Sequence, residues 1–198
     1  MDYIKKAKKM ARKHKMKMHL DGARSFNGAA FLGISPAEMC KDFDTVSVCL
    51  SKGLGAPLGS VVVGKEKDIK HCLILRKLLG GNLRQAGIIC QAALHNLENW
   101  EESFNKDHDN CMWLAKELAA LDMIELDTSL VETNMFRFKF KPESGLKHDE
   151  FANRMKEKHG ILMTYGHKNE AIRLVTHRNI DKAMIEKTIK LFKKEIKL

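Results

Sequence analysis

Features that define several classes of protein are missing from this 198-residue sequence. No apolar run approaches the roughly 18 residues that a membrane-spanning helix needs, so we expect a soluble protein with no membrane partner. The five cysteines are odd in number and contain no Cys-x-x-Cys pair, which argues against a disulfide framework and favours reduced thiols in the cytoplasm. The nine histidines show no metal-ligand spacing. With only 3 Pro and 13 Gly, the composition is neither disordered nor collagen-like.

The unusual quantity is the net charge of +10, and it is unevenly distributed. Residues 1–18 carry most of the excess and residues 181–198 the rest, while the body of the chain is neutral. Both segments have apolar residues at helical spacing and lysines on the other face, as in amphipathic surface helices. A targeting presequence or a nucleic-acid-binding arm is the alternative for residues 1–18. Because zinc-finger, helix-turn-helix and RNP-type motifs are absent, we expect no nucleic-acid partner.

The first half alternates short apolar strands with helices, the pattern of an α/β sheet. Residues 45–50 form a β-branched run that we expect to be a buried strand, and Ser35 precedes Pro36 as the N-cap of a short helix. The remaining expected elements are helices at 2–16, 36–40, 66–78 and 84–100, and strands at 16–20 and 60–63.

The second half predicts a smaller α+β domain. Phe136, Phe138 and Phe140 share one parity, which is typical of a strand with one buried face. The expected elements are strands at 123–126, 134–140, 162–165 and 172–176, with helices at 107–121, 147–159 and the C-terminus. We therefore predict a large domain over residues 1–104 and a small one over 105–198, with the change of texture near 100–106.

Lys52 stands at the end of the expected buried strand and opens a glycine-studded loop, residues 53–59. The glycine spacing is one residue too long for a dinucleotide-binding loop, and a strand follows where a helix is required. A P-loop would need its lysine after the last glycine. Burial would favour the neutral, nucleophilic amine that a Schiff-base lysine uses. The alternative, a lysine that only reaches out to solvent from the sheet edge, remains open.

Asp21 and Arg24 follow another expected strand, at its carboxyl end. Ligands of open α/β sheets gather at such ends, so Asp21, Arg24 and Lys52 could converge on one ligand. A carboxylate, a guanidinium and a lysine suit pyridoxal 5'-phosphate, because an aspartate keeps its ring nitrogen protonated. An ordinary Asp21–Arg24 salt bridge is the alternative interpretation.

Four motifs in order resemble the threonine aldolase family of fold-type-I pyridoxal-phosphate enzymes, within the β-eliminating lyase group. They are HLDGARSFN, SVCLSKGLGAPLGSVVVG, LRKLLGGNLRQAG and IRLVTH. The resemblance implies the C-terminal part of a large domain with a mostly parallel sheet and helices, followed by a complete small α+β domain.

Residue by residue, the resemblance implies that Lys52 forms the Schiff base and Asp21 pairs with the pyridine nitrogen. Arg24 matches an arginine near the cofactor and the substrate carboxylate, and Arg173 matches the carboxylate-binding arginine of the small domain. Lys77 and Arg84 match basic residues that approach the cofactor phosphate. Asn82 replaces a usual glycine, and asparagine tolerates positive φ if the position requires it.

The implied activity is that of a lyase in threonine catabolism and glycine biosynthesis. It is the cleavage of a β-hydroxy-α-amino acid such as threonine or allo-threonine to glycine and an aldehyde. The resemblance also implies a homo-oligomer, and we expect the cytoplasm as compartment. Family members carry a long stretch before HLDGAR, with a phosphate-binding loop and a ring-stacking histidine, for which this chain has no substitute. The alternative is therefore a non-catalytic truncated isoform or remnant, with exposed sheet edges and apolar surface.

Overall fold

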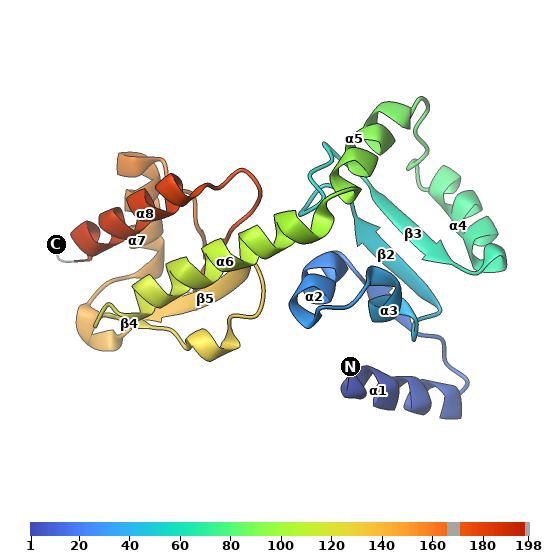
Figure 1. Ribbon diagram of the computed structural model, residues 1–198, viewed down its shortest axis with the longest axis horizontal. Helices are drawn as coiled ribbons and strands as arrows, with labels where there is room; N and C mark the ends of the chain where they lie inside the picture. Colours follow the sequence, from blue (N-terminus) through green and yellow to red (C-terminus); the bar gives the residue numbers. More distant parts are fainter. Residues whose placement is uncertain (166–170, 197–198) are drawn as a thin grey trace. The chain divides into compact units, whose positions relative to one another are not determined.

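The computed structural model describes residues 1–165 and 171–196, which divide into two compact units. The first unit comprises residues 1–102 and the second unit residues 103–198. The division falls inside one long helix, α6, which runs from Trp100 to Ala119 (Figure 1).

The first unit contains a three-stranded sheet in the order β1-β2-β3. Its strands are β1 (His19–Asp21), β2 (Thr45–Cys49) and β3 (Ser60–Gly64). β2 and β3 lie close to the predicted ranges, whereas β1 begins three residues later than the predicted strand 16–20. β1 and β2 are parallel, whereas β3 pairs with β2 in the antiparallel direction. The carboxyl ends of β1 and β2 therefore lie at one edge of the sheet, and the loop that joins β2 to β3 starts and ends at that edge.

The helices of the first unit are α1 (Asp2–Lys13), α2 (Ser25–Leu32), α3 (Pro36–Cys40), α4 (Glu66–Leu78) and α5 (Gly87–Leu97). The Ser35 hydroxyl accepts a hydrogen bond from the Glu38 backbone N–H at 3.1 Å, which confirms the predicted N-cap of α3. α5 is shorter than the predicted helix 84–100, because it begins only at Gly87 and Trp100 belongs to α6.

Helix α1 has the burial pattern of a surface helix, with only Ala11 buried among its described residues. It ends at Lys13, earlier than predicted, and Lys15 then turns the chain with φ 54°. Lys8 forms an ion pair with Asp44 at 3.5 Å, and the Asp44 carboxylate also accepts the Met18 backbone N–H at 2.8 Å. These contacts attach the basic helix to the start of β2.

The first unit buries little of its apolar surface. The prediction that 45–50 is buried throughout was wrong, because only Val46 and Leu50 are buried and the other four residues are half-buried. All five residues of β3 are exposed, and so are Leu78 and Leu79 at the end of α4. The physical reason is the width of the sheet: β1 and β3 are both edge strands, so β2 is its only interior strand among the described residues.

The second unit has a four-stranded antiparallel sheet in the order β4-β5-β7-β6. The strands are β4 (Ile124–Glu125), β5 (Met135–Phe140), β6 (Thr164–Tyr165) and β7 (Ile172–Val175). Besides α6, its helices are α7 (His148–His159) and α8 (Lys182–Glu195), with short 3-10 turns η1 (Thr128–Leu130) and η2 (Pro142–Ser144).

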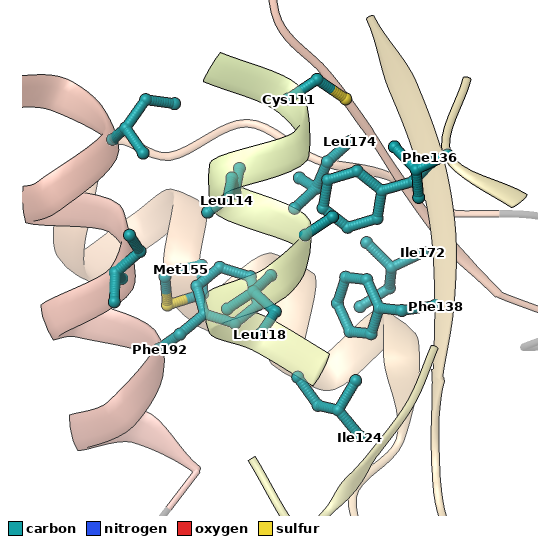
Figure 2. Packing of buried hydrophobic residues seen from close by; sticks show 14 of the residues in the cluster. Cys111, Leu114, Leu118, Ile124, Phe136, Phe138, Met155, Ile172, Leu174 and Phe192 are labelled. Atoms are coloured by element: carbon teal, nitrogen blue, oxygen red, sulfur yellow. The ribbon is translucent and has the colours of Figure 1, made fainter. Parts of the chain in front are cut away.

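The core of the second unit lies between one face of this sheet and its three helices (Figure 2). Phe136, Phe138 and Phe140 point into it, as their common parity predicted, while Arg137 and Lys139 between them are exposed on the outer face. The Phe138 ring lies 5.9 Å from the Phe192 ring of α8, centroid to centroid. The inner face of β5 is thus aromatic, and its outer face carries two basic side chains.

A buried carboxylate joins α7 to α8. Glu195 of α8 is 2% exposed, forms an ion pair with Arg154 at 3.1 Å and shares a hydrogen bond with His159 at 2.9 Å, while Lys158 lies 3.8 Å away. The hydrogen bond with His159 and the nearby cations lower the pKa of Glu195, against the opposing effect of burial. The carboxylate therefore stays ionised and holds the two helices together.

Candidate functional site

Asp21 and Lys52 lie at the same edge of the first unit's sheet. Asp21 is the last residue of β1 and pairs in register with Ser47 of β2. Lys52 follows Cys49, the last residue of β2, by three positions. Because β1 and β2 are parallel, the Asp21 carboxylate and the Lys52 amine lie at the same carboxyl edge of the sheet, where ligands of α/β sheets bind.

The turn after β1 is packed too closely against β2 to accept a side chain at Gly22. A Cβ there would lie 2.7 Å from the Ser47 carbonyl oxygen and 2.9 Å from Val46 Cγ1. The Ser25 hydroxyl donates to the Gly22 carbonyl at 2.9 Å and closes the turn. This close approach holds the neighbouring Asp21 beside the end of β2.

Asp21 and Arg24 are both left available for a ligand. The Asp21 side chain is exposed, and Oδ1 accepts the Ala23 backbone N–H at 3.2 Å. Arg24 is half-buried and directly precedes α2. The alternative of an Asp21–Arg24 salt bridge is not what the structure contains, since Arg24 has no ion-pair partner within residues 1–165 and 171–196.

The loop that carries Lys52 is compact. The Gly55 N–H donates to the Lys52 carbonyl at 2.8 Å, and the Ala56 N–H donates to the Leu50 carbonyl at 2.9 Å. Gly55 has φ +66°, a conformation that glycine adopts at little cost. The buried side chains of Leu54 and Ala56 anchor the loop. The backbone of Lys52 is thus held in place.

Of the two interpretations left open for Lys52, a desolvated amine and a lysine that reaches solvent from the sheet edge, the structure agrees with the second, because its side chain is exposed. The strand before it is only partly covered, and the loop places the lysine at the surface of the sheet edge. The charge of Lys52 nevertheless affects the pKa of the nearby Cys49 thiol. Burial raises the pKa of the Cys49 thiol, but hydrogen bonding with Ser51 and Ser60 and the nearby Lys52 charge lower it by more.

Lys77 and Arg84 are exposed, and no contact among the described residues joins them to Lys52. Lys77 lies in the last turn of α4, which runs back alongside β3, and Arg84 lies in the segment before α5 (Figure 1). Asn82 does not have positive φ; the residues of this segment that do are Gly80 at 73° and Gln85 at 51°. Asparagine therefore replaces glycine there without strain, and the phosphate-binding role of Lys77 and Arg84 stays a prediction.

Arg173 belongs to the second unit, on the outer face of β7. Its neighbours Ile172 and Leu174 are buried in the core, whereas Arg173 itself is half-buried. Its Nε is buried and has no hydrogen-bond partner among the described residues. Directly opposite on β5 stands Arg137, which the motifs did not single out. The Phe136-Phe138-Phe140 alternation assigns Arg137 to the outer face, but only the strand register places it beside Arg173.

The groups at the sheet edge of the first unit fit the ring and aldehyde ends of pyridoxal 5'-phosphate. Lys52 offers an accessible amine for the aldehyde, and the exposed Asp21 carboxylate can accept a hydrogen bond from the protonated pyridine nitrogen. Across residues 1–165 and 171–196, no three His, Cys, Asp or Glu side chains are grouped as metal ligands. No helix in that part of the chain has the length and apolar character to cross a membrane.

Known proteins resemble this chain along nearly its whole length. Low-specificity L-threonine aldolase 1 of Arabidopsis thaliana is 37% identical over 192 residues, which are 97% of this chain and 53% of that protein. A crystal structure from Exiguobacterium, described as an aromatic amino acid β-eliminating lyase/threonine aldolase, has a TM-score of 0.76 at 18% identity and covers 97% of this chain and 56% of that one. A PLP-dependent aminotransferase from Streptococcus suis also has a TM-score of 0.76, at 14% identity, over 99% of this chain and 52% of that one.

These likenesses establish the fold as the mixed α/β architecture of fold-type-I PLP enzymes, of which this chain contains about half. The chain spans about half the length of the curated relatives that it matches. The sequence profile of the β-eliminating lyases matches residues 1–141, which include β1, the Lys52 loop and the whole of β5. The chain therefore belongs to the β-eliminating lyase family.

Proposed function

We propose that this chain supplies part of a pyridoxal-phosphate-dependent aldolase that cleaves β-hydroxy-α-amino acids of the threonine and allo-threonine type to glycine and an aldehyde. The observation that carries the proposal is that Asp21 and Lys52 both lie at the carboxyl end of the parallel pair β1 and β2, Asp21 as the last residue of β1 and Lys52 in the loop after β2. The names of its relatives, which are low-specificity L-threonine aldolases, support this substrate class.

Asp21, Lys52 and Arg24 would hold the cofactor. The Lys52 amine would bind covalently to the aldehyde carbon of the cofactor, and the Asp21 carboxylate would keep the ring nitrogen of the cofactor protonated. Arg24 would add a positive charge at the same edge, near the cofactor or the substrate carboxylate. When bound, pyridoxal phosphate supplies an electron sink for the electron pair left when the Cα–Cβ bond breaks. Lys77 and Arg84 are proposed for the phosphate group.

Arg173 is proposed to bind the substrate carboxylate. Its guanidinium is half-buried and has an Nε without a partner among the described residues, so an incoming carboxylate would satisfy a donor that is otherwise left unpaired. A two-point contact between a planar guanidinium and a carboxylate fixes the direction of the substrate. Fixing that direction is a positioning effect, which contributes to the rate by aligning the bond to be broken.

A non-catalytic role is the second candidate, and the exposed apolar surface of the first unit favours it. The exposed β3 side chains and the end of α4 would be suited to association with further protein, either another copy of this chain or a longer relative. In that form the chain would keep the family's residues without a competent site. The free cysteines support a cytoplasmic location for either candidate.

Cofactor capture at Lys52 tests the proposal. Pyridoxal 5'-phosphate added to the purified chain should produce a visible absorbance band, and borohydride should then fix the cofactor on the peptide that contains Lys52. Lys52→Ala should lose the band and the label completely, whereas Lys65→Ala, at another exposed lysine of the first unit, should retain both. Labelling of a different lysine contradicts the assignment.

The two candidate functions differ in product formation. Release of glycine from threonine by the loaded chain supports the aldolase and rejects the non-catalytic role. A chain that folds, as judged by its circular dichroism, but captures no cofactor supports the non-catalytic role.

A further inference from the structure

Two arginines face each other on the outer face of the second unit's sheet. Arg137 of β5 pairs directly with Arg173 of β7. Side chains paired across antiparallel strands project from the same face, with Cβ atoms about 5 Å apart. The residues on either side of them, Phe136 and Phe138 on β5 and Ile172 and Leu174 on β7, are buried on the inner face. The two guanidinium groups therefore belong to one surface.

This arrangement is unfavourable without an anion. Like charges placed directly opposite each other destabilise a sheet. Neither arginine has an ion-pair partner within residues 1–165 and 171–196, although other cations of the second unit do. Arg173 also keeps its Nε buried with no hydrogen-bond partner in that part of the chain. On its other side, Arg173 pairs with Thr164 of β6, which is neutral.

A hollow of about 800 Å³ adjoins Arg137. Its charged lining residues besides Arg137 are Lys139, Glu125 and Asp127. Glu125 stands opposite Lys139 in the strand register, and the Asp127 carboxylate accepts hydrogen bonds from the N–H and hydroxyl of Ser129 at 2.9 and 2.6 Å. Neither acidic group forms an ion pair with Arg137 in the part of the chain that the structure describes. Arg137 and Arg173 thus stand opposite each other on this face, and neither forms an ion pair among the described residues.

We infer that Arg137 is a second carboxylate-binding residue, which acts with Arg173 on the carboxylate of the amino-acid substrate. One carboxylate lying between the two guanidinium groups neutralises their repulsion and accepts hydrogen bonds from both. The assignment of the ligand as a substrate carboxylate rests on the proposed function, but the pairing of the two arginines does not. Because the guanidinium fork matches the carboxylate in plane and spacing, lysine at position 137 is a poor replacement.

Arginine side-chain NMR of the full chain tests the pair, with acetate as the probe and inorganic phosphate as the comparison. The Nε–Hε signals of Arg137 and Arg173 should shift together and report one Kd for acetate. In Arg137→Gln the Arg173 signal should still shift, with a Kd about tenfold weaker, which corresponds to about 1.4 kcal/mol. Arg137→Lys should fall between the two. Lys139→Gln is the matched control on the same strand and face, and it should leave the Kd unchanged.

An unchanged Kd in Arg137→Gln, or different Kd values at the two arginines, overturns the inference. Saturation by phosphate but not by acetate also overturns it, because the site would then not be a carboxylate site. If Arg137→Gln does not fold, the Arg137→Lys comparison decides. The titration needs no pyridoxal phosphate, so failure of the arginine-pair inference can be distinguished from failure of the proposed aldolase function. Joint acetate binding without cofactor capture rejects the aldolase, whereas capture at Lys52 without joint binding rejects only the arginine pair.

Discussion

Cys49 ends β2 and Lys52 follows it by three positions, and the Lys52 charge acts on the pKa of the Cys49 thiol. Sγ of Cys49 lies 3.4 Å from the Ser51 hydroxyl, and the pKa of the thiol is lowered although burial opposes it. Burial raises the pKa of Cys40, and it raises that of Cys111 to about 12. The pKa is therefore lowered for one thiol, that of Cys49 at the end of β2, and raised for two others, those of Cys40 and Cys111.

We predict that Cys49 is alkylated at lower pH than Cys40 or Cys111. Only the thiolate reacts, so a lowered pKa moves the midpoint of the rate against pH downward. Lys52→Met removes the positive charge and should move this midpoint upward, while Lys67→Met, on α4, should leave it in place. Iodoacetamide labelling followed by peptide mass spectrometry measures the rates. A Cys49 midpoint at or above that of Cys40, or one that does not respond to Lys52→Met, would contradict this account.

At the scale of elements, helix α6 is joined to the strands of the second unit by polar contacts. The Thr176 hydroxyl, just after β7, donates to the Asp107 carbonyl of α6 at 2.7 Å, and the Asn134 amide donates to the Thr176 carbonyl at 2.7 Å. The Asp107 side chain is 1% exposed, and burial raises its pKa to about 6 although Arg178 and Lys106 oppose the shift. Hydrogen bonds to backbone carbonyls therefore attach α6 to the sheet. Its buried Asp107 carboxylate lowers the stability of the unit at neutral pH, because the charged form is desolvated.

We predict that Asp107→Asn stabilises the second unit at neutral pH. Because the folded pKa lies above the unfolded value, Asp107 contributes stability below about pH 4 and loses it as pH rises through about 6. At pH 7.5 the variant should be more stable by up to about 3 kcal/mol, at 1.36 kcal/mol per pKa unit, and the gain should vanish near pH 4. Hydrogen exchange of β5 and β7 amides measures it. Asp109→Asn, at an exposed carboxylate of the same helix, is the control. A gain that does not grow with pH would refute the prediction.

At the scale of the molecule, the two units bury apolar surface to different extents. The second unit packs one continuous core of aromatic and aliphatic side chains, with Phe138, Phe151 and Phe192 almost fully inaccessible. The first unit exposes more than 40% of each β3 valine and 75% and 84% of Leu78 and Leu79. An exposed apolar edge strand is a template for pairing with another chain. The first unit is therefore the part of the chain from which we expect association.

We predict that the purified chain self-associates with rising concentration and binds a hydrophobic dye such as anilinonaphthalene sulfonate. Val62→Lys with Leu79→Lys should reduce both, because charges on an apolar edge disfavour pairing. Leu162→Lys makes the same kind of change at a leucine of the second unit that is 75% exposed, and it should have little effect. Analytical ultracentrifugation and dye fluorescence give the readings. Equal effects of the two sets of substitutions would show that the exposed β3 and α4 residues are not responsible.

The alternation of Phe136, Phe138 and Phe140 predicted β5 and its buried face correctly, because a strand places every second side chain on one side. Ser35 before Pro36 predicted the start of α3 for an equally local reason. Helix ends were less predictable: α5 and α6 meet near Trp100, where helical periodicity runs on without interruption.

The exposure of Lys52 could not be predicted from its neighbours in the chain, since a β-branched run predicts burial only when other strands and helices cover it. Lys52 is exposed because the sheet has few strands to cover the end of β2, and the number of strands in a sheet is a property of tertiary structure. The absence of an Asp21–Arg24 ion pair is similar, because side-chain orientation after a turn depends on what the turn packs against.

The sequence by itself determined the order of the elements, the parity of the strands and, through its motifs, the family and the candidate residues Lys52, Asp21 and Arg173. These depend on local periodicity, turn chemistry and residue identity. Only the tertiary structure decided that Asp21 and Lys52 share one edge, that Lys52 is exposed, and that Arg137 stands opposite Arg173. The reason is that strand direction and register join residues far apart in the chain, and each is set by packing that no single segment encodes.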